Sequence, residues 1–230
     1  MRYFVETLPR HLLSGAGEAL SGTRLATLVA SGGAAGLLTL ADGEVHGYFT
    51  RDRSSENPRR RLGHTPGEIG VTLGLPATLF GMAGGIYALG VVTREPRTQE
   101  TAELALESLL LVGGTGQALK VVTQRERPDR SNRLSFPSLH AGGSFAFATT
   151  LDGQYGWRVG VPAYLLAAFI SVARIQDQKH FLSDTVFGAG LGTVMALGVR
   201  QVHRRAAPPR VQVLPLVARN LAGLLVHVDF

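Results

Sequence analysis

The sequence predicts an all-α protein: a six-helix bundle that crosses a membrane several times, followed by a short C-terminal β-hairpin. Hydrophobic residues make up 45% of the 230 residues and charged residues only 17%, whereas an average soluble chain has about 25% charged residues. Glycine, which is more frequent in membrane helices than in soluble ones, occurs 29 times. Apolar stretches of helical length recur along the chain, and strand-like alternation is absent before the tail.

Six apolar segments are the candidates for the helices of the bundle. The segment 70–92 carries no charge and is long enough to cross about 30 Å of hydrocarbon at ~1.5 Å per residue. The alternative is a soluble helical bundle, but a segment of this length without charge favours a membrane bundle. Several other segments are shorter than the roughly 20 residues of a usual span, so flanking residues would have to extend them. The six segments are 25–41, 70–92, 104–122, 138–151, 159–173 and 185–199.

The segments divide the chain into three parts. Residues 1–24 form an N-terminal amphipathic or loop segment, residues 25–200 form the helical domain, and residues 201–230 form a basic tail. Valines alternate with polar residues in the tail, which predicts a hairpin that turns around residues 220–223. The polar stretch 42–69 is expected to be a solvated loop, with a contact to acidic lipid headgroups as the alternative.

Charge and cysteine content narrow the chemistry further. The chain has no cysteine, which excludes disulfides and thiolate catalysis. The net charge of +6 is compatible with an anionic lipid, an anionic substrate or nucleic acid. Zinc-finger spacing and RNA-binding aromatic motifs are absent, so no nucleic-acid partner is expected.

Two polar clusters flank the third and fourth apolar segments. Lys120 and Arg127 are seven residues apart in KVVTQRERP, nearly two helical turns, which would place both on one face of a helix. Pro128 disfavours helical geometry at Arg127, so the helix should end there. In PSLH, which ends at His140, Ser138 is a good N-cap. A helix that begins at Ser138 would direct free N–H groups outward and form an anion site.

A third cluster, ARIQDQKHFLSD, joins the fifth and sixth segments. Its His180 and Asp184 are four residues apart, so the carboxylate can reach the imidazole on one helical face. Taken alone, each cluster has a common structural explanation. The basic loop could be a topology signal, Ser138 a helix cap, and His180 with Asp184 a structural pair. Together they provide cations to hold phosphate oxygens, one histidine to attack phosphorus and one to protonate the leaving oxygen. The set suits phosphoryl transfer, and the cations make a metal unnecessary.

The three clusters resemble the signature of the type-2 phosphatidic acid phosphatases, the PAP2 superfamily, which also contains the vanadium haloperoxidases. The pattern of that family is K-x6-RP, then PSGH, then SR-x5-H-x3-D. The motifs span residues 120–184, and the six-segment layout extends the resemblance to about residues 25–200. The first and third patterns are matched in spacing by Lys120, Arg127 and Pro128 and by Arg174, His180 and Asp184.

The resemblance implies a role for each matched position and implies neither a metal nor a cofactor. The catalytic residues would be His180 as the nucleophile that forms a phosphohistidine, Asp184 as its orienting partner and His140 as the general acid. The phosphate oxygens would be held by Lys120, Arg127, Ser138, the backbone N–H of Leu139, and Arg174.

Two positions depart from the family pattern. Leu139 stands where the family has glycine, but leucine adopts the negative φ of a first helical turn without strain. Its N–H can therefore still reach a phosphate, and its side chain is expected to face the lipid or the acyl region of the substrate. Ala173 stands where the family usually has serine, so one hydroxyl is missing. If that hydroxyl only supports the site, its loss costs on the order of 1 kcal/mol.

By resemblance, the expected function is metal-independent hydrolysis of a lipid phosphate monoester or diphosphate, on a phospholipid or polyprenyl phosphate. The alternatives are an acid phosphatase for soluble esters, a vanadate-dependent haloperoxidase and a non-catalytic membrane protein that binds anionic lipid. Phosphatidate, phosphatidylglycerophosphate, polyprenyl diphosphate and a lipid A phosphate all remain open as substrates, as does the oligomeric state.

The expected location is the cell's inner membrane, with several passes. Antiparallel neighbours would place the loops 121–137 and 175–183 on one side, as a single active site requires. The basic tail favours a cytoplasmic C-terminus and hence an extracytoplasmic site, although the arginines at 59–61 oppose this orientation.

Overall fold

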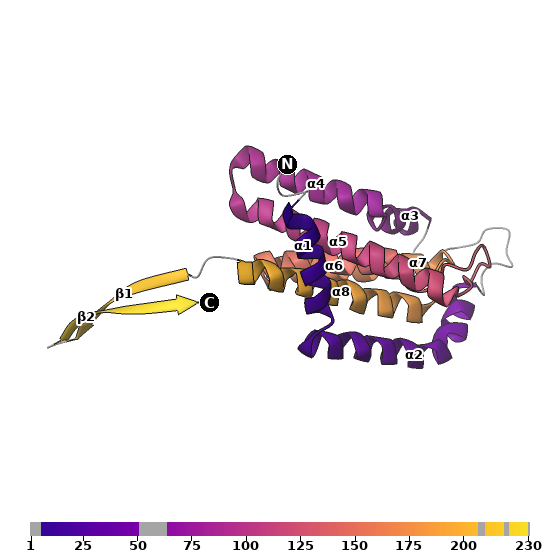
Figure 1. Ribbon diagram of the computed structural model, residues 1–230. Helices are drawn as coiled ribbons and strands as arrows, with labels where there is room; N and C mark the ends of the chain where they lie inside the picture. The colour runs from indigo at the N-terminus through magenta and orange to yellow at the C-terminus, as the bar shows by residue number, and fades with distance from the viewer. Residues whose placement is uncertain (1–5, 51–63, 207–209, 219–220, 230) are drawn as a thin grey trace.

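The protein is a bundle of long helices followed by a two-stranded hairpin (Figure 1). The computed structural model describes residues 6–50, 64–206, 210–218 and 221–229. Five helices in this part of the chain, α2, α4, α5, α7 and α8, are long and apolar enough to cross a membrane. The helices are α1 (Leu8–Ala19), α2 (Gly22–Thr50), α3 (His64–Leu73), α4 (Pro76–Thr93), α5 (Pro96–Thr123), α6 (Leu139–Tyr155), α7 (Trp157–Gln176) and α8 (Leu182–Ala206).

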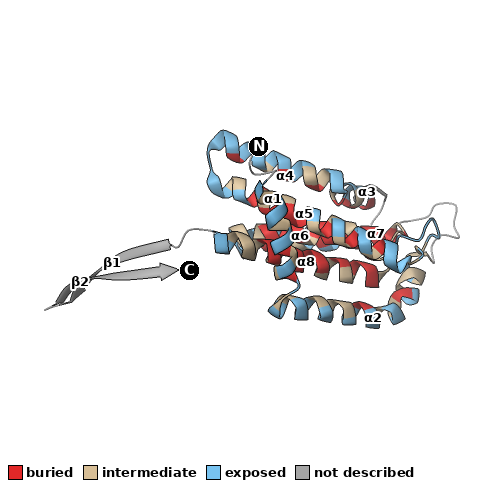
Figure 2. Ribbon diagram, in the orientation of Figure 1, coloured by how far each residue is buried: buried red, intermediate tan, exposed pale blue. Residues whose placement is uncertain are grey.

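Helices α6 and α8 form the centre of the bundle. Helix α8 packs against α1, α2, α5 and α6, and α6 also packs against α5 and α7. Figure 2 shows buried residues concentrated on these central helices and exposed ones on α1, α2 and α4. A Cβ at Gly192 of α8 would overlap the carbonyl oxygen of Gly142 on α6, so the two backbones approach closely because glycine is there. Small residues are the usual means of such contact between membrane helices.

The second apolar segment is not the single span that the sequence predicted. It is divided between α3, which ends at Leu73, and α4, which begins at Pro76. Leu75 between them is extended, with φ −61° and ψ 138°, because the residue before a proline is pushed out of helical geometry. Helix α4 is therefore the candidate span, and α3 is a separate short helix that packs on α7.

The polar stretch 42–69 is also more helical than expected. Helix α2 continues to Thr50 and α3 begins at His64, so much of the stretch is helix and the remainder lies outside the described residues. The continuation of α2 carries Asp42 into the bundle, where it is only 5% exposed. Within the predicted N-terminal segment, residues Leu8–Ala19 form α1, which packs against α8 and α5.

The tail forms two antiparallel strands, β1 (Arg210–Ala218) and β2 (Leu221–Asp229). The ladder pairs Ala218 with Leu221 and Leu216 with Gly223. Gly223, which the sequence analysis placed in the turn, therefore lies within the strand pairing.

Candidate active site at one end of the bundle

The three polar clusters meet at one end of the bundle, as antiparallel neighbours predict. The loop after α5 and the loop after α7 are joined by a hydrogen bond of 3.1 Å from the Asp129 N–H to the Gln178 carbonyl. A second bond of 3.1 Å runs from the Ser138 N–H, at the start of α6, to the Asp184 carbonyl in the first turn of α8. These bonds bring the end of α5, the start of α6, the end of α7 and the start of α8 together.

The three cations that the sequence predicted to hold phosphate, Lys120, Arg127 and Arg174, lie at this end. Lys120, in the last turn of α5, is 5% exposed, and its Nζ donates to the Leu134 carbonyl at 2.5 Å. Arg174, near the end of α7, is buried and has a long ion pair of 3.6 Å with Asp177. Among the described residues, no hydrogen-bond partner is found for the buried Nε of Arg127 or of Arg174. These N–H groups are donors that an anion between the helix ends could use.

Helix α6 begins at this cluster with its N-terminus free. Ser138 is its N-cap, and the Oγ accepts a long hydrogen bond of 3.4 Å from the Ala141 N–H. His140 lies in the first turn and is packed against Gly74, where a Cβ would come within 3.1 Å of its Cδ2 atom. Its Nε2 is buried and has no partner in the described part of the chain. The start of α6 therefore offers free backbone N–H groups and a histidine nitrogen at the same point.

His180 lies between α7 and α8 and is 2% exposed. Its Nδ1 is 2.6 Å from the carbonyl oxygen of Ser135, which can only accept, so Nδ1 carries the proton. The neutral ring therefore keeps its lone pair on Nε2. Burial lowers the pKa of His180 to about 4; the charges of Lys120 and Arg174 act in the same direction, and Asp184 opposes them. The imidazole is thus unprotonated near neutral pH.

Asp184 lies beside His180, as their spacing predicted, but it does not orient the ring by a direct hydrogen bond. The distance from His180 Nδ1 to Asp184 Oδ2 is 3.8 Å, which is too long. That Oδ2 instead accepts from the Ser135 Oγ at 2.5 Å and from the Phe181 N–H at 2.9 Å. Asp184 therefore fixes Ser135, and the Ser135 carbonyl fixes the ring.

Arg125 and Asp42 belong to this arrangement, and the sequence analysis did not assign them a role. The Nη1 of Arg125 donates to Asp184 Oδ1 and to the Ser183 Oγ, at 2.7 Å each. Its Nη2 donates to Asp42 Oδ2 at 2.8 Å, and Asp42 also accepts from the Ser183 N–H at 3.0 Å. The sequence offers only a weak indication that these two residues belong to the site: Asp42 follows an apolar segment, and Arg125 lies inside the first motif.

The side chain of Leu139 does not face lipid or substrate, contrary to the expectation. It packs against α5, where a Cβ at Gly116 would overlap its Cδ2 atom, and against the core cluster that contains Val112 and Leu191. The leucine therefore fills the α5–α6 interface. Only its backbone N–H, at the start of the helix, lies at the candidate site.

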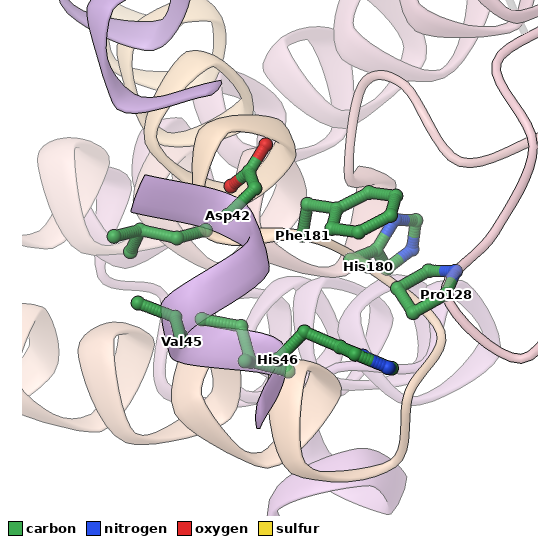
Figure 3. Close-up of a pocket in the computed structure, with 8 residues that line it drawn as sticks. Asp42, Val45, His46, Pro128, His180 and Phe181 are labelled. Carbon is green, nitrogen blue, oxygen red and sulfur yellow. The ribbon is translucent and has the colours of Figure 1, made fainter. Parts of the chain in front are cut away.

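A narrow pocket lies between α2 and the loop that carries His180 (Figure 3). Its position shows that α2 forms one wall beside the candidate nucleophile. The pocket is lined by Asp42, Val45, His46, Pro128, Ile175, His180, Phe181 and Leu182.

The donor set at this end suits an anion better than a metal. The carboxylates of Asp42 and Asp184 are both paired with Arg125, so neither is a free anionic ligand. Lys120, Arg127 and Arg174 all act electrostatically on His140. An anion with several oxygens, such as a phosphate, is what such a group of buried donors can bind.

Known proteins with similar sequences are lipid phosphatases by name. The lipid A 1-phosphatase of Porphyromonas gingivalis is 36% identical over 90 residues, which are 38% of this chain and 20% of that protein. The lipid A 4'-phosphatase of Helicobacter pylori is 27% identical over 99 residues, which are 43% of this chain and 48% of that protein. The aligned part thus spans about a fifth to about half of the length of these relatives.

The fold has a counterpart of known structure. The crystal structure of a transmembrane PAP2-type phosphatidylglycerolphosphate phosphatase from Bacillus subtilis superposes with a TM-score of 0.59 at 18% identity. The match covers 90% of this chain and 98% of that one. Residues 103–208, which contain all three polar clusters, match the PAP2 superfamily, and the chain shares the fold of the transmembrane PAP2-type enzyme.

Proposed function

We propose that this protein is a metal-independent phosphatase that hydrolyses a lipid phosphate through a phosphohistidine formed on His180. The observation that carries the proposal is the hydrogen bond from His180 Nδ1 to the Ser135 carbonyl, which leaves the Nε2 lone pair free in a buried cluster of cations. A neutral, fixed imidazole beside donors for phosphate oxygens is what nucleophilic attack on phosphorus requires.

The reaction would proceed in two steps. Lys120, Arg127 and Arg174 hold the phosphate oxygens, and His180 Nε2 attacks phosphorus while the bond to the leaving oxygen breaks. Burial and the nearby cations lower the pKa of His140 to about 3 in the empty site. The negative charge of the bound phosphate raises this pKa, so that His140 carries a proton and gives it to the leaving oxygen as the alcohol or phosphate departs. In the second step a water attacks the phosphohistidine, His140 takes the proton of that water, and inorganic phosphate is released from His180.

A lipid A phosphate is the first substrate to test, because both named relatives are lipid A phosphatases. The cluster lies where candidate membrane spans α5, α7 and α8 begin or end, which is where a lipid headgroup would reach it. We infer that this end faces the extracytoplasmic side, because Arg204 and Arg205 lie at the opposite end of α8 and basic residues favour the cytoplasm.

The substrate class can be tested by phosphate release in detergent from lipid A, phosphatidate, phosphatidylglycerophosphate and polyprenyl diphosphate, with para-nitrophenyl phosphate as the soluble comparison. The expected result is higher kcat/KM for at least one lipid than for the soluble ester. Turnover of the soluble ester alone would favour the acid-phosphatase alternative. Vanadate-dependent oxidation of bromide by added hydrogen peroxide, without phosphate release, would favour the haloperoxidase. Lipid binding without turnover would favour the non-catalytic alternative.

Replacing the nucleophile should abolish turnover, whereas replacing one cation should weaken it less completely. His180→Ala removes the only atom that forms the covalent intermediate, while Lys120→Ala leaves Arg127 and Arg174 to hold the phosphate. Single-turnover assays with radiolabelled substrate, quenched in base, should show a phosphorylated chain for the wild type and none for His180→Ala. Substantial turnover by His180→Ala would refute the assignment.

Because the pKa of His180 is lowered to about 4, the acid limb of kcat/KM should lie below pH 5.

Removal of divalent ions should leave catalysis intact, because the buried carboxylates of Asp42 and Asp184 are paired with Arg125 and the positive charge is supplied by side-chain cations. The measurement is the initial rate of phosphate release after EDTA treatment. The assay temperature is kept well below Tm, so that a change in protein stability caused by chelation does not alter the rate. Vanadate should inhibit competitively, since it is held by the same donors as phosphate. A rate lost on chelation and restored by magnesium would contradict the mechanism.

Arg125 should act as a positioning residue. Arg125→Ala breaks charge-assisted hydrogen bonds to Asp42 and Asp184, worth about 1.5–3 kcal/mol each, so kcat should fall about 10–100-fold with a smaller change in KM. The matched control is Arg133→Ala, which removes an exposed arginine from the same loop and should leave kcat unchanged. Equal effects of the two variants, or a change confined to KM, would show that Arg125 contributes only general charge.

A further inference from the structure

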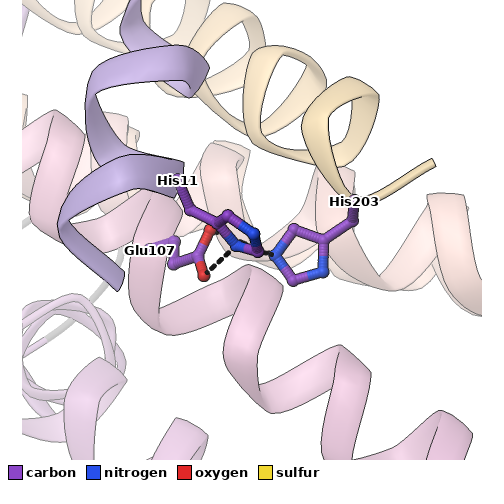
Figure 4. Close-up of side chains that lie close together, drawn as sticks. All are labelled: His11, Glu107 and His203. Carbon is purple, nitrogen blue, oxygen red and sulfur yellow. Dashed lines mark hydrogen bonds and ion pairs between the residues drawn. The ribbon is translucent and has the colours of Figure 1, made fainter. Parts of the chain in front are cut away.

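Figure 4 shows a second cluster of titratable side chains. It joins His11 of α1, Glu107 of α5 and His203 of α8. His11 Nδ1 is 3.0 Å from Glu107 Oε1, and His203 Nε2 is 3.1 Å from Glu107 Oε2. The two ring nitrogens are 3.2 Å from each other, so two nitrogens and two oxygens converge on one point.

The cluster is separate from the candidate active site. Glu107 precedes Lys120 by 13 residues on α5, which is about 20 Å along a helix. His203 follows Asp184 by 19 residues on α8, which is about 28 Å. Both helices therefore place the cluster toward the opposite end of the bundle, where the mechanism proposed above uses no residue.

The burial of Glu107 requires an explanation. Its side chain is 0% exposed, while those of His11 and His203 are 17% and 9% exposed. A buried carboxylate is costly unless it is paired or coordinates a metal. Glu103, one turn earlier on α5, acts electrostatically on the same histidines and adds a further negative charge that favours a cation here.

The distances fit a tetrahedral metal site. Ligand atoms that lie ~2.0 Å from a central ion at tetrahedral angles are about 3.3 Å from one another. The two nitrogens are 3.2 Å apart, and each lies near a different oxygen of Glu107, at 3.0 Å for His11 and 3.1 Å for His203, which is close to this value. Two imidazole nitrogens and one carboxylate are a ligand set that zinc accepts, with a fourth position left for water. Imidazole ligands also favour zinc, copper and nickel over magnesium and calcium.

We propose that His11, Glu107 and His203 bind a divalent transition-metal ion, with zinc as the preferred ion. The ion fixes the N-terminal helix α1 against α5 and α8, because each of these three helices supplies one ligand. The proposal does not depend on the function proposed for the other end of the bundle.

The test uses the full-length protein in detergent, purified without a histidine tag and measured for bound zinc by elemental analysis and by competition with a chromophoric chelator. The wild type should hold about one zinc per chain, and His203→Ala and Glu107→Gln should hold none. Zinc at a free concentration about 100-fold above Kd should raise the Tm of the wild type by about 5–10 °C. Magnesium should not change Tm, and zinc should not change that of His203→Ala.

The matched control is His227→Ala, which removes a histidine of β2 and should keep the bound zinc and the shift. If Glu107→Gln does not fold, His11→Ala changes the most exposed ligand and is expected to lose the metal instead. A wild type that neither retains zinc nor gains Tm from it would show that the triad is held by hydrogen bonds alone. Zinc that persists in the triad variants and disappears from His227→Ala would overturn the proposal and place the ion on the hairpin.

Discussion

The pairing of one guanidinium with two buried carboxylates is the constraint on which the candidate site depends. Asp42 comes from α2 and Asp184 from α8, and Arg125 bonds to both from the loop between α5 and α6. Each carboxylate alone would repel a bound phosphate and would be costly to bury. Once Arg125 cancels much of this negative charge, Lys120 and Arg174 dominate the field that a phosphate would meet.

The same constraint orders the neighbouring polypeptide. Because Arg125 fixes Asp184, the second carboxylate oxygen of Asp184 is free to accept from Ser135 and from the Phe181 N–H. The Ser135 carbonyl then selects the tautomer of His180. The close backbone contact between α6 and α8 completes the arrangement, since a Cβ at Gly188 would strike the carbonyl oxygen of Ser138 at the start of α6. Packing between glycines is thus what brings the N-terminus of α6 up to the histidine loop.

The sequence predicts those residues of the candidate site whose positions follow from a pattern of neighbouring residues. The spacings in the segments 120–128 and 174–184 located the cations and His180, and Ser138 marked the start of α6, because helix ends and one-turn spacings are set by neighbouring residues. Pro76 also indicated the break between α3 and α4. The segment 70–92 was nevertheless predicted as one span because it is apolar throughout. Asp42 and Leu139 were misjudged because their environments are made by helices distant in the chain. No spacing rule joins His11, Glu107 and His203, so that cluster is visible only in three dimensions.

The two ends of α8 show how one helix can support opposite chemistries. Its N-terminal end carries the positive end of the helix dipole and meets the start of α6, whose dipole points the same way, so both favour an anion beside His180. Its C-terminal end carries the negative end of the dipole and holds His203, where a cation is favoured. Helix α5 runs in the opposite direction, and Lys120 in its last turn offsets the negative dipole end that would otherwise face the phosphate. Lys120 therefore offsets the dipole of α5 at the phosphate end of the bundle, and His203 lies where the dipole of α8 favours a cation.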